Sequence, residues 1–251
     1  AHRERVKAMQ CQREDDRAQR QQLAAADALK RWTAATPCTQ HDYLTSKGIQ
    51  PNGAKIEGDK LLIPMRDMTG TLHSLQTITP NGDKMFMSGG RVKDCYHSIG
   101  KQPTDVLIVG EGYATCASIH EATGHPIVVA FNAGNLEPVA VALRTKYPSL
   151  KIIIAADDDH LTDGNPGLTK ARSAAQAVGG FLAVPSFPTY RPDKATDFND
   201  LHLLVGPDAV KECIDNALNS VAASAYSTGA TGQFGMWPAP KEIKTDLPPA
   251  P

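Results

Sequence analysis

Two groups of acidic residues directly follow short hydrophobic segments of the chain. Glu111 follows residues 106–110, and Asp157, Asp158 and Asp159 follow residues 151–156. Short runs of Val, Ile and Leu are typical of buried strands in a parallel sheet. Ligands of such sheets bind beyond the carboxyl ends of the strands. We therefore expect these carboxylates to converge on one site if the two strands are neighbours.

Clustered carboxylates favour one kind of chemistry. Like charges a few ångströms apart raise each other's pKa, so a cluster is costly unless cations neutralise it. Hard oxygen ligands are those that Mg²⁺ and Mn²⁺ prefer. A strand-end aspartate that caps the next helix is the simpler alternative, but it explains one acid and not acids at two strand ends. The pattern therefore predicts a metal site that contains Glu111, Asp157 and Asp159.

From residue 106 onward, strand patterns alternate with helix patterns. Strands are predicted at residues 106–109, 127–131, 151–156 and 181–184, and helices at 113–122, 135–147, 167–178 and after Gly206 and Pro207. Asn135 is expected to be the N-cap of the second helix. The alternation predicts an α/β fold with a four-stranded, mainly parallel sheet that carries helices on its faces.

Three motifs in this region resemble those of a known family. Residues 111–115, Glu-Gly-Tyr-Ala-Thr, resemble the E-G-Y-A-T signature of primases from conjugative plasmids and satellite phages. Asp157-x-Asp159 is similar to the D-x-D motif of the wider Toprim family, which includes DnaG-type primases, topoisomerases and some nucleases. Residues 197–201, Asp-Phe-Asn-Asp-Leu, resemble the D-F-N-D segment of the plasmid and phage group. The motifs occur in the family's order, and the resemblance covers roughly residues 60–215.

The resemblance implies a site and a reaction. Glu111, Asp157 and Asp159 would be catalytic, and these three together with Asp197 and Asp200 would hold two Mg²⁺ or Mn²⁺ ions. The expected protein is a DNA primase that synthesises short RNA primers from NTPs on single-stranded DNA for a plasmid, phage or other mobile element.

Nucleotidyl transfer fits these residue types. A hydroxyl attacks an α-phosphate while pyrophosphate leaves, and two metals about 3.5–4 Å apart activate the first and neutralise the second. Two positions differ from the family pattern. Asn199 stands where the DnaG-type pattern has an acid, and Asp158 is an extra carboxylate without an assigned role.

The remaining sequence predicts further segments around a Toprim catalytic domain at residues 104–223. Residues 1–35 are expected to form a helical segment, because they are rich in Arg, Gln, Glu and Ala. Residues 36–103 contain short apolar runs broken by turns, and they look like the small mixed α/β, basic N-terminal subdomain of the same primases. Residues 224–251 are expected to be a disordered tail rich in Ser, Thr, Gly and Pro.

Basic and aromatic side chains are candidates for contacts with nucleotides and DNA. The formal net charge is −1, so a local basic face must bind the template, weakly and with strong salt dependence. Phe86 and Tyr96 lie among the basic residues, which suits bases that stack beside a phosphate-binding groove. The predicted contacts are Arg66, Lys84, Arg91, Lys93 and Lys101, with Lys170 in the helix after the aspartates.

Composition excludes several classes. The five cysteines are scattered without a C-x-x-C pair, so neither a structural zinc site nor a secreted disulfide scaffold is expected. Without an apolar run long enough to span a bilayer, no membrane partner and a cytoplasmic location are expected. The start at Ala1 indicates a piece of a longer polypeptide. In the absence of a Walker motif, a helicase domain or replication proteins would lie elsewhere in that parent.

Two alternative functions remain open. A Toprim nuclease or topoisomerase-like fragment would use the same metal site to cut DNA, although the chain has little room for a separate tyrosine domain. A non-catalytic module that binds single-stranded DNA within a primase-helicase would retain the fold alone. The products distinguish these functions, since only a primase makes oligoribonucleotides from NTPs.

Overall fold

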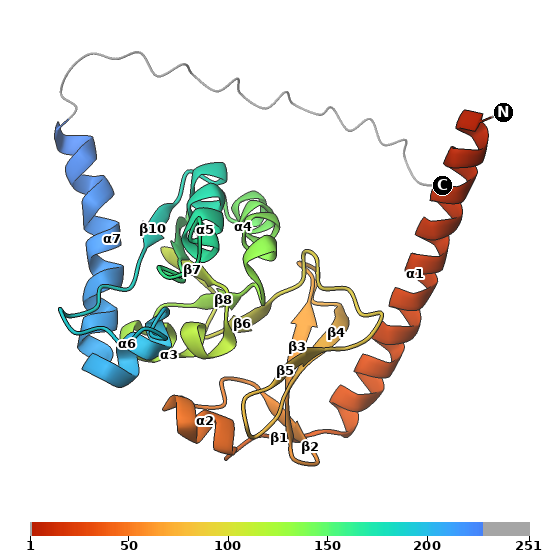
Figure 1. Cartoon of the computed structure of the whole chain (residues 1–251), viewed down its shortest axis with the longest axis horizontal. Helices are drawn as coiled ribbons and strands as arrows, with labels where there is room; N and C mark the ends of the chain where they lie inside the picture. Colours follow the sequence, from red (N-terminus) through yellow and green to blue (C-terminus); the bar gives the residue numbers. More distant parts are fainter. Residues whose placement is uncertain (1, 228–251) are drawn as a thin grey trace, which may run out of the picture.

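The computed structural model describes residues 2–227, which form a long N-terminal helix, two β-sheets and six further helices (Figure 1). One hydrophobic core joins the two sheets. Leu61 and Ile78 of the first sheet belong to the same buried cluster as Ile108 and Ile127 of the second. Apolar side chains of both sheets thus leave water together, which holds the two sheets in contact.

The first sheet is antiparallel, with the strand order β1-β2-β3-β4-β5. Its strands are β1 (Thr36–Pro37), β2 (Lys55–Glu57), β3 (Lys60–Arg66), β4 (Leu72–Ile78) and β5 (Lys84–Phe86). A short helix, α2 (Asp42–Lys47), lies between β1 and β2 in the sequence. It ends at Gly48 with φ 62°, a left-handed conformation that favours glycine.

The N-terminal helix α1 (His2–Ala34) buries side chains only toward its C-terminal end. Residues 2–20 are exposed, whereas Ala28 is fully buried in a cluster with Leu62 and Leu75. Arg31 forms an ion pair of 2.5 Å with Glu57. The helical segment predicted at residues 1–35 is therefore present, and one end of it projects away from the sheets (Figure 1).

The second sheet has the order β10-β9-β7-β8-β6. Its strands are β6 (His97–Ile99), β7 (Val106–Gly110), β8 (Ile127–Val129), β9 (Lys151–Ala155) and β10 (Phe181–Ala183). The four predicted strands are parallel, which confirms the α/β fold class. The sheet differs from the predicted four-stranded one because it has a fifth strand, β6, which pairs antiparallel with β8. It comes from the end of the segment predicted as the N-terminal subdomain, residues 36–103. That division of the chain stays a prediction.

Helices cover both faces of this sheet. α4 (Ala133–Lys146) and α5 (Pro166–Ala177) pack on the face that carries Leu107 and Ile152. α3 (Tyr113–Thr123), α6 (Phe198–Val205) and α7 (Pro207–Ser227) pack on the face that carries Ile108 and Ile153. The alternation along β7 and β9 follows from the two-residue period of a strand. When helices cover both faces of a parallel sheet, only the ends of its strands remain open to ligands.

The end of the chain is described as far as Ser227. α7 reaches that residue, so the first four positions of the tail predicted at residues 224–251 are helical. Residues 228–251, on which the rest of that prediction falls, lie outside the described residues. Within residues 2–227, no helix is long and apolar enough to cross a membrane.

Asn135 corrects one local prediction. α4 begins at Ala133 with Asn132 at the N-cap position, so Asn135 lies inside the helix. Its buried side chain accepts a hydrogen bond from the Asp94 amide (2.9 Å) and donates to the Cys95 carbonyl (2.8 Å). It also donates to the Ala130 carbonyl, at 2.9 Å. Asn135 therefore ties the loop before β6 to the end of β8, a role that a local helix signal does not reveal.

We predict that Asn135→Ala lowers the free energy of unfolding by about 2–3 kcal/mol, because it leaves several buried backbone groups without partners. Chemical denaturation measures this loss. Asn132→Ala is the matched control: the Asn132 side chain makes no capping hydrogen bond, and its loss should cost about 0.5 kcal/mol or less. Equal losses in the two variants would contradict the role assigned to Asn135.

Candidate active site

The predicted acids lie where two neighbouring parallel strands end. β7 pairs with β9, with Val109 opposite Ile154, so Glu111 and Asp157 follow adjacent strand ends. Both side chains line a cavity of about 180 Å³, together with Asp197 from the N-terminus of α6. The structure thus brings Glu111 and Asp157 together with Asp197, whereas the predicted Asp159 is not among the residues that line this cavity.

Asp157 is the most strongly perturbed of these acids. Its Oδ1 atom is buried and has no hydrogen-bond partner among the described residues. Burial raises the pKa of Asp157 well above its ordinary value, and the charges of Asp197, Glu111 and Asp159 raise it further. A buried carboxylate oxygen without a donor is costly unless a ligand or a proton meets it.

Glu111 occupies a similar but more solvated position. Burial raises the pKa of Glu111, and the carboxylates of Asp159 and Asp197 add to the shift. The amide of Ala133, at the start of α4, donates a hydrogen bond to the Glu111 carboxylate and opposes the shift. The helix start thus orients the glutamate, while its neighbours keep its proton affinity high.

Asp159 is held by the start of another helix. Its Oδ2 atom accepts a hydrogen bond of 3.0 Å from the Gly167 amide in α5. A Cβ atom at Gly167 would lie 2.7 Å from the Asp157 carbonyl oxygen and 2.8 Å from Asp159 Oδ2. Only glycine leaves room for this approach. Gly167 therefore positions the D-x-D segment, a role that sequence reasoning did not assign.

Asp158, which had no predicted role, is part of an ion pair away from the cavity. Its carboxylate contacts Arg191 at 2.5 Å and accepts a hydrogen bond of 2.6 Å from Asn165. Burial alone would raise the pKa of Asp158, but the hydrogen bonds from Arg191 and Asn165 hold it below its ordinary value. Arg191 also lies over the ring of Phe187, 4.3 Å from its centre. This pair fixes the loop that carries Asp157 and Asp159.

Asp197 and Asp200 form a capping box at the start of α6. Asp197 Oδ1 accepts from the Asp200 amide (2.9 Å), and its Oδ2 accepts from the Thr115 hydroxyl (2.8 Å). Asp200 Oδ2 accepts from the Thr196 amide at 2.8 Å. Asp197 reaches the cavity lining, whereas Asp200 is engaged behind it. The structure thus brings Asp197, but not Asp200, to the other acids.

Asn199, which stands where the DnaG-type pattern has an acid, joins three helices. Asn199 is fully buried, and its side chain donates to the Lys47 carbonyl (2.7 Å) and the Ser118 hydroxyl (2.9 Å). It therefore joins α6 to α2 and α3. Tyr43 of α2 lies nearby, with a buried hydroxyl that has no described partner and a pKa raised by burial and by Asp197. No local signal in the sequence pointed to Tyr43.

The predicted basic contacts do not form one groove. Lys84 of β5 lines the acidic cavity. Lys93 lines an open cavity beside the start of α4, and the neighbouring Arg91 contacts Asp94 at 3.5 Å. Arg66 and Lys101 line other cavities, outside the acidic one. Lys170 is exposed on α5. Of the aromatic residues, Phe86 packs edge-on against Phe131 of the acidic cavity, with ring centres 6.3 Å apart.

The residues of the cavity fit a hard divalent cation by their chemistry. The unpartnered Asp157 oxygen is the observation that supports this fit, since a cation would meet it and offset the repulsion among the acids. In the described part of the chain, no three His, Cys, Asp or Glu side chains are already spaced as metal ligands. The site therefore has the donor types of a metal centre without its final side-chain spacing.

Asp157 should make stability depend on pH when no metal is bound. The pKa values of Asp157 and Glu111 are raised in the folded chain, so the folded state binds more protons than the unfolded state above about pH 4. Their contribution to stability therefore falls as pH rises through the folded pKa values. Asp157→Asn should raise the melting temperature in EDTA, most at about pH 8 and progressively less toward about pH 5.

Thermal unfolding of the wild type and the variant across this pH range measures the effect. Asp163→Asn, in the exposed part of the same loop, is the matched control and should leave the melting temperature unchanged. A difference between wild type and Asp157→Asn that does not change with pH would contradict the explanation.

Comparison with known proteins places this geometry in a family. Residues 106–208 match the family model described as Toprim domain. Two proteins of Escherichia coli named DNA primase TraC are 40% identical over 182 residues and 41% identical over 180 residues. Each alignment covers 67% of this chain but only 17% and 12% of the relatives, so the chain spans less than a fifth of either.

Solved primase structures share the fold. The primase fragment of the bacteriophage T7 primase-helicase protein has a TM-score of 0.52 at 17% identity, over 72% of this chain and 74% of that chain. The DnaG primase catalytic domain bound to ssDNA has a TM-score of 0.53 at 12% identity, over 82% and 84%. The chain therefore carries a Toprim domain at residues 106–208, within the fold of primase catalytic cores.

Proposed function

We propose that the chain is the catalytic core of a DNA primase, which joins NTPs into short RNA primers on a single-stranded DNA template. The observation that carries this proposal is the buried, unpartnered Asp157 carboxylate at adjacent strand ends, with Glu111 and Asp197 in the same cavity. The two TraC relatives, which are named as DNA primases, support it.

The acids match the needs of nucleotidyl transfer. We assign Glu111, Asp157 and Asp159 as catalytic residues, with Asp157 and Asp159 as the principal ligands of Mg²⁺ or Mn²⁺ and with Glu111 and Asp197 as further ligands. Bound divalent ions supply charge neutralisation at the attacking and leaving oxygens. Asp200 supports the site through its contact with Asp197, which it holds in the capping box.

Glu111 and Lys84 would act on the substrates. The raised pKa of Glu111 enables its carboxylate to accept the proton of a primer 3′-hydroxyl as that hydroxyl attacks the α-phosphate. Lys84, an exposed cation in the cavity lining, lowers the pKa of Asp157, and we assign it to contact triphosphate oxygens.

The template would contact the basic residues next to the acidic cavity. Arg17 of α1 and Lys93 line one open cavity at the start of α4, beside the helix end that orients Glu111. Because the formal net charge of the chain is −1, only a local basic patch can attract the template. The binding of template DNA should therefore be weak and sensitive to salt.

Further parts of a longer polypeptide would load this core on DNA. The T7 relative is a primase-helicase protein, and we propose that a helicase domain or replication proteins have the same role here, in the cytoplasm.

We predict that Asp157→Asn lowers primer synthesis by about 10²-fold or more, because it removes a charged metal ligand without changing volume. Labelled oligoribonucleotides made from NTPs on single-stranded DNA measure the loss. Asp163→Asn, at an exposed position of the same loop, is the matched control, and we expect its activity to equal that of wild type. An active Asp157→Asn variant, or DNA cleavage without NTPs, would overturn the proposal.

We predict that Glu111→Gln lowers the rate of dinucleotide formation by about 10²-fold, the usual range for a lost general base. The wild-type rate should fall as pH drops through the raised Glu111 pKa, because the protonated carboxyl accepts no proton. The variant should lack this acid limb.

Calorimetric titration of Mn²⁺ provides the control for Glu111. The variant should bind Mn²⁺ much better than Asp159→Asn does. Equal loss of Mn²⁺ binding in both variants would make Glu111 a principal ligand instead of a base.

A further inference from the structure

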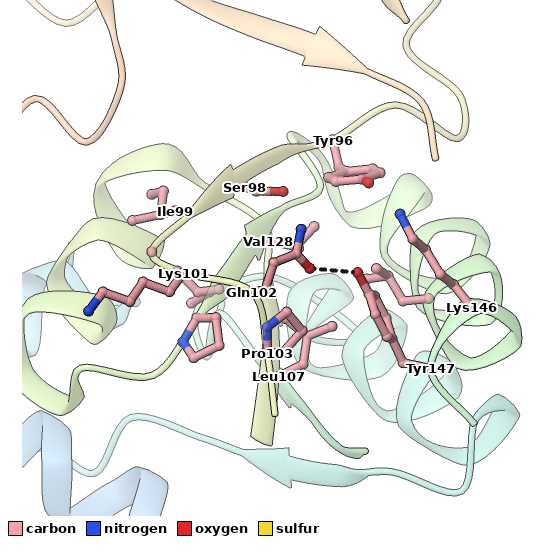
Figure 2. A pocket seen from close by; sticks show the side chains of 14 residues that line it. Tyr96, Ser98, Ile99, Lys101, Gln102, Pro103, Leu107, Val128, Lys146 and Tyr147 are labelled. Atoms are coloured by element: carbon pink, nitrogen blue, oxygen red, sulfur yellow. Dashed lines mark hydrogen bonds between the residues drawn. The ribbon is translucent and has the colours of Figure 1, made fainter. Parts of the chain in front are cut away.

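The acids follow the carboxyl ends of the parallel strands, and a second cavity lies at the amino ends of these strands. Its volume is about 110 Å³, and Leu107 near the start of β7 and Ile127 at the start of β8 line it. Tyr147, the residue after α4, closes another side (Figure 2). Glu111 and Asp157 follow the other ends of β7 and β9, so the sheet separates the two sites.

This cavity adjoins a more open one of about 370 Å³. The two share Tyr96, Ser98, Gln102 and Lys146 in their linings, and Arg66 lines the larger one. The larger volume falls in the range of small-molecule sites. The pair thus forms a continuous hollow with a narrow inner part and a wide outer part.

Aromatic, polar and basic side chains surround the opening. Figure 2 shows Tyr96, Gln102, Lys146 and Tyr147 around it. The Tyr147 hydroxyl donates to Gln102 Oε1 at 3.1 Å, which fixes both side chains. Lys146 Nζ lies 5.5 Å from the centre of the Tyr147 ring, and Lys101 stands exposed at the rim. Apolar side chains line the inner part: Leu107, Val128 and Leu143.

The basic and aromatic residues predicted to contact nucleic acid are divided by the fold. Lys84 alone of that set lines the acidic cavity, whereas Arg66, Tyr96 and Lys101 line the two other cavities along β6: Tyr96 pairs with Arg66 just before β6, and Lys101 follows it. The proposed catalytic site leaves these three unused. Tyrosine rings beside lysine and arginine are the side chains that bind a base and its phosphate.

We propose that this hollow is a second nucleotide-binding site, in which a base contacts Tyr96 and Tyr147 and its phosphate contacts Lys146 and Arg66. The ligand is a nucleotide unit, either a free mononucleotide or one nucleotide of a DNA strand. Gln102, which exposes its amide at the opening, donates to the base edge.

One acid, Asp67, lines the outer part of the hollow. Its Oδ2 contacts His73 Nε2 at 2.7 Å, and its Oδ1 accepts from the Thr69 and Thr71 amides. These contacts hold the pKa of Asp67 below its ordinary value, so it stays ionised, but Arg66 and Lys146 in the same lining outnumber it. The cations at the rim therefore set the local preference for an anion.

The test is ¹⁹F NMR of the 251-residue chain labelled with 3-fluorotyrosine at its six tyrosines, in EDTA. Tyr96→Phe and Tyr147→Phe assign the two resonances of interest. We expect both to shift in a saturable way on titration with adenosine 5′-monophosphate or with hexadeoxyadenylate. A response to the mononucleotide identifies a free nucleotide as ligand, and a response to the oligonucleotide alone identifies a DNA strand. No shift with either probe overturns the proposal.

A charge-matched pair of variants makes the test specific. Arg66→Gln with Lys146→Gln should weaken binding about tenfold or more, since phosphate contacts are lost. Lys7→Gln with Lys211→Gln changes the net charge equally at exposed positions elsewhere and should leave affinity unchanged. Equal weakening by both pairs would overturn the proposal. Asp157→Asn should bind the probe as wild type does, so this result is independent of primer synthesis.

Discussion

Repulsion among buried carboxylates is the constraint on which the rest of this structure depends. Asp157, Glu111 and Asp197 share one small cavity, and burial and their mutual charge raise the pKa of Asp157. Such an arrangement persists only when other contacts hold each acid in place. The amide of Gly167 holds Asp159, the amide of Ala133 holds Glu111, and the capping box holds Asp197. Helix starts thus supply the partial positive charge that the cluster lacks.

The two sheets depend on each other through polar ties as well as their common core. Asn199 joins α6 to α2, and the Tyr113 hydroxyl donates to the Pro51 carbonyl. His97 of β6 contacts the Asn52 carbonyl at 2.9 Å, and burial lowers its pKa to about 4, so it is neutral at physiological pH. These ties bring Lys84 of the first sheet to the acids of the second. Lys84 and the acids of the cavity therefore come from separate parts of the chain.

Ligands can reach the parallel sheet at both ends of its strands. Acids lie at the carboxyl ends, as expected for loops that follow strands. The amino end of the sheet carries Tyr147, Lys146 and Lys101, and the cavity there extends along β6 to Tyr96. Because β6 runs antiparallel to β8, the segment after it returns to that amino end, which places Lys101 and Gln102 there.

The sequence by itself determined the α/β class, the four parallel strands and the acids at two strand ends. Each of these follows from local signals: apolar runs of strand length, alternation with helices, and carboxylates directly after a strand. The roles of Asp158, Asp200 and Asn135 were decided by tertiary structure. Each depends on a partner distant in sequence or on the true start of a helix: Arg191 for Asp158, and the loop before β6 for Asn135.

The division of the basic residues was also decided by tertiary structure. Lys84, Arg91 and Arg66 are close in sequence and equivalent in composition, yet the strand pairings send them to different places. The short strand β6 gave no signal of its own, because three residues are too few to show a period. Long-range strand pairing and packing determine where these residues lie, because local propensity does not distinguish them. For the same reason, no sequence motif predicted the second cavity.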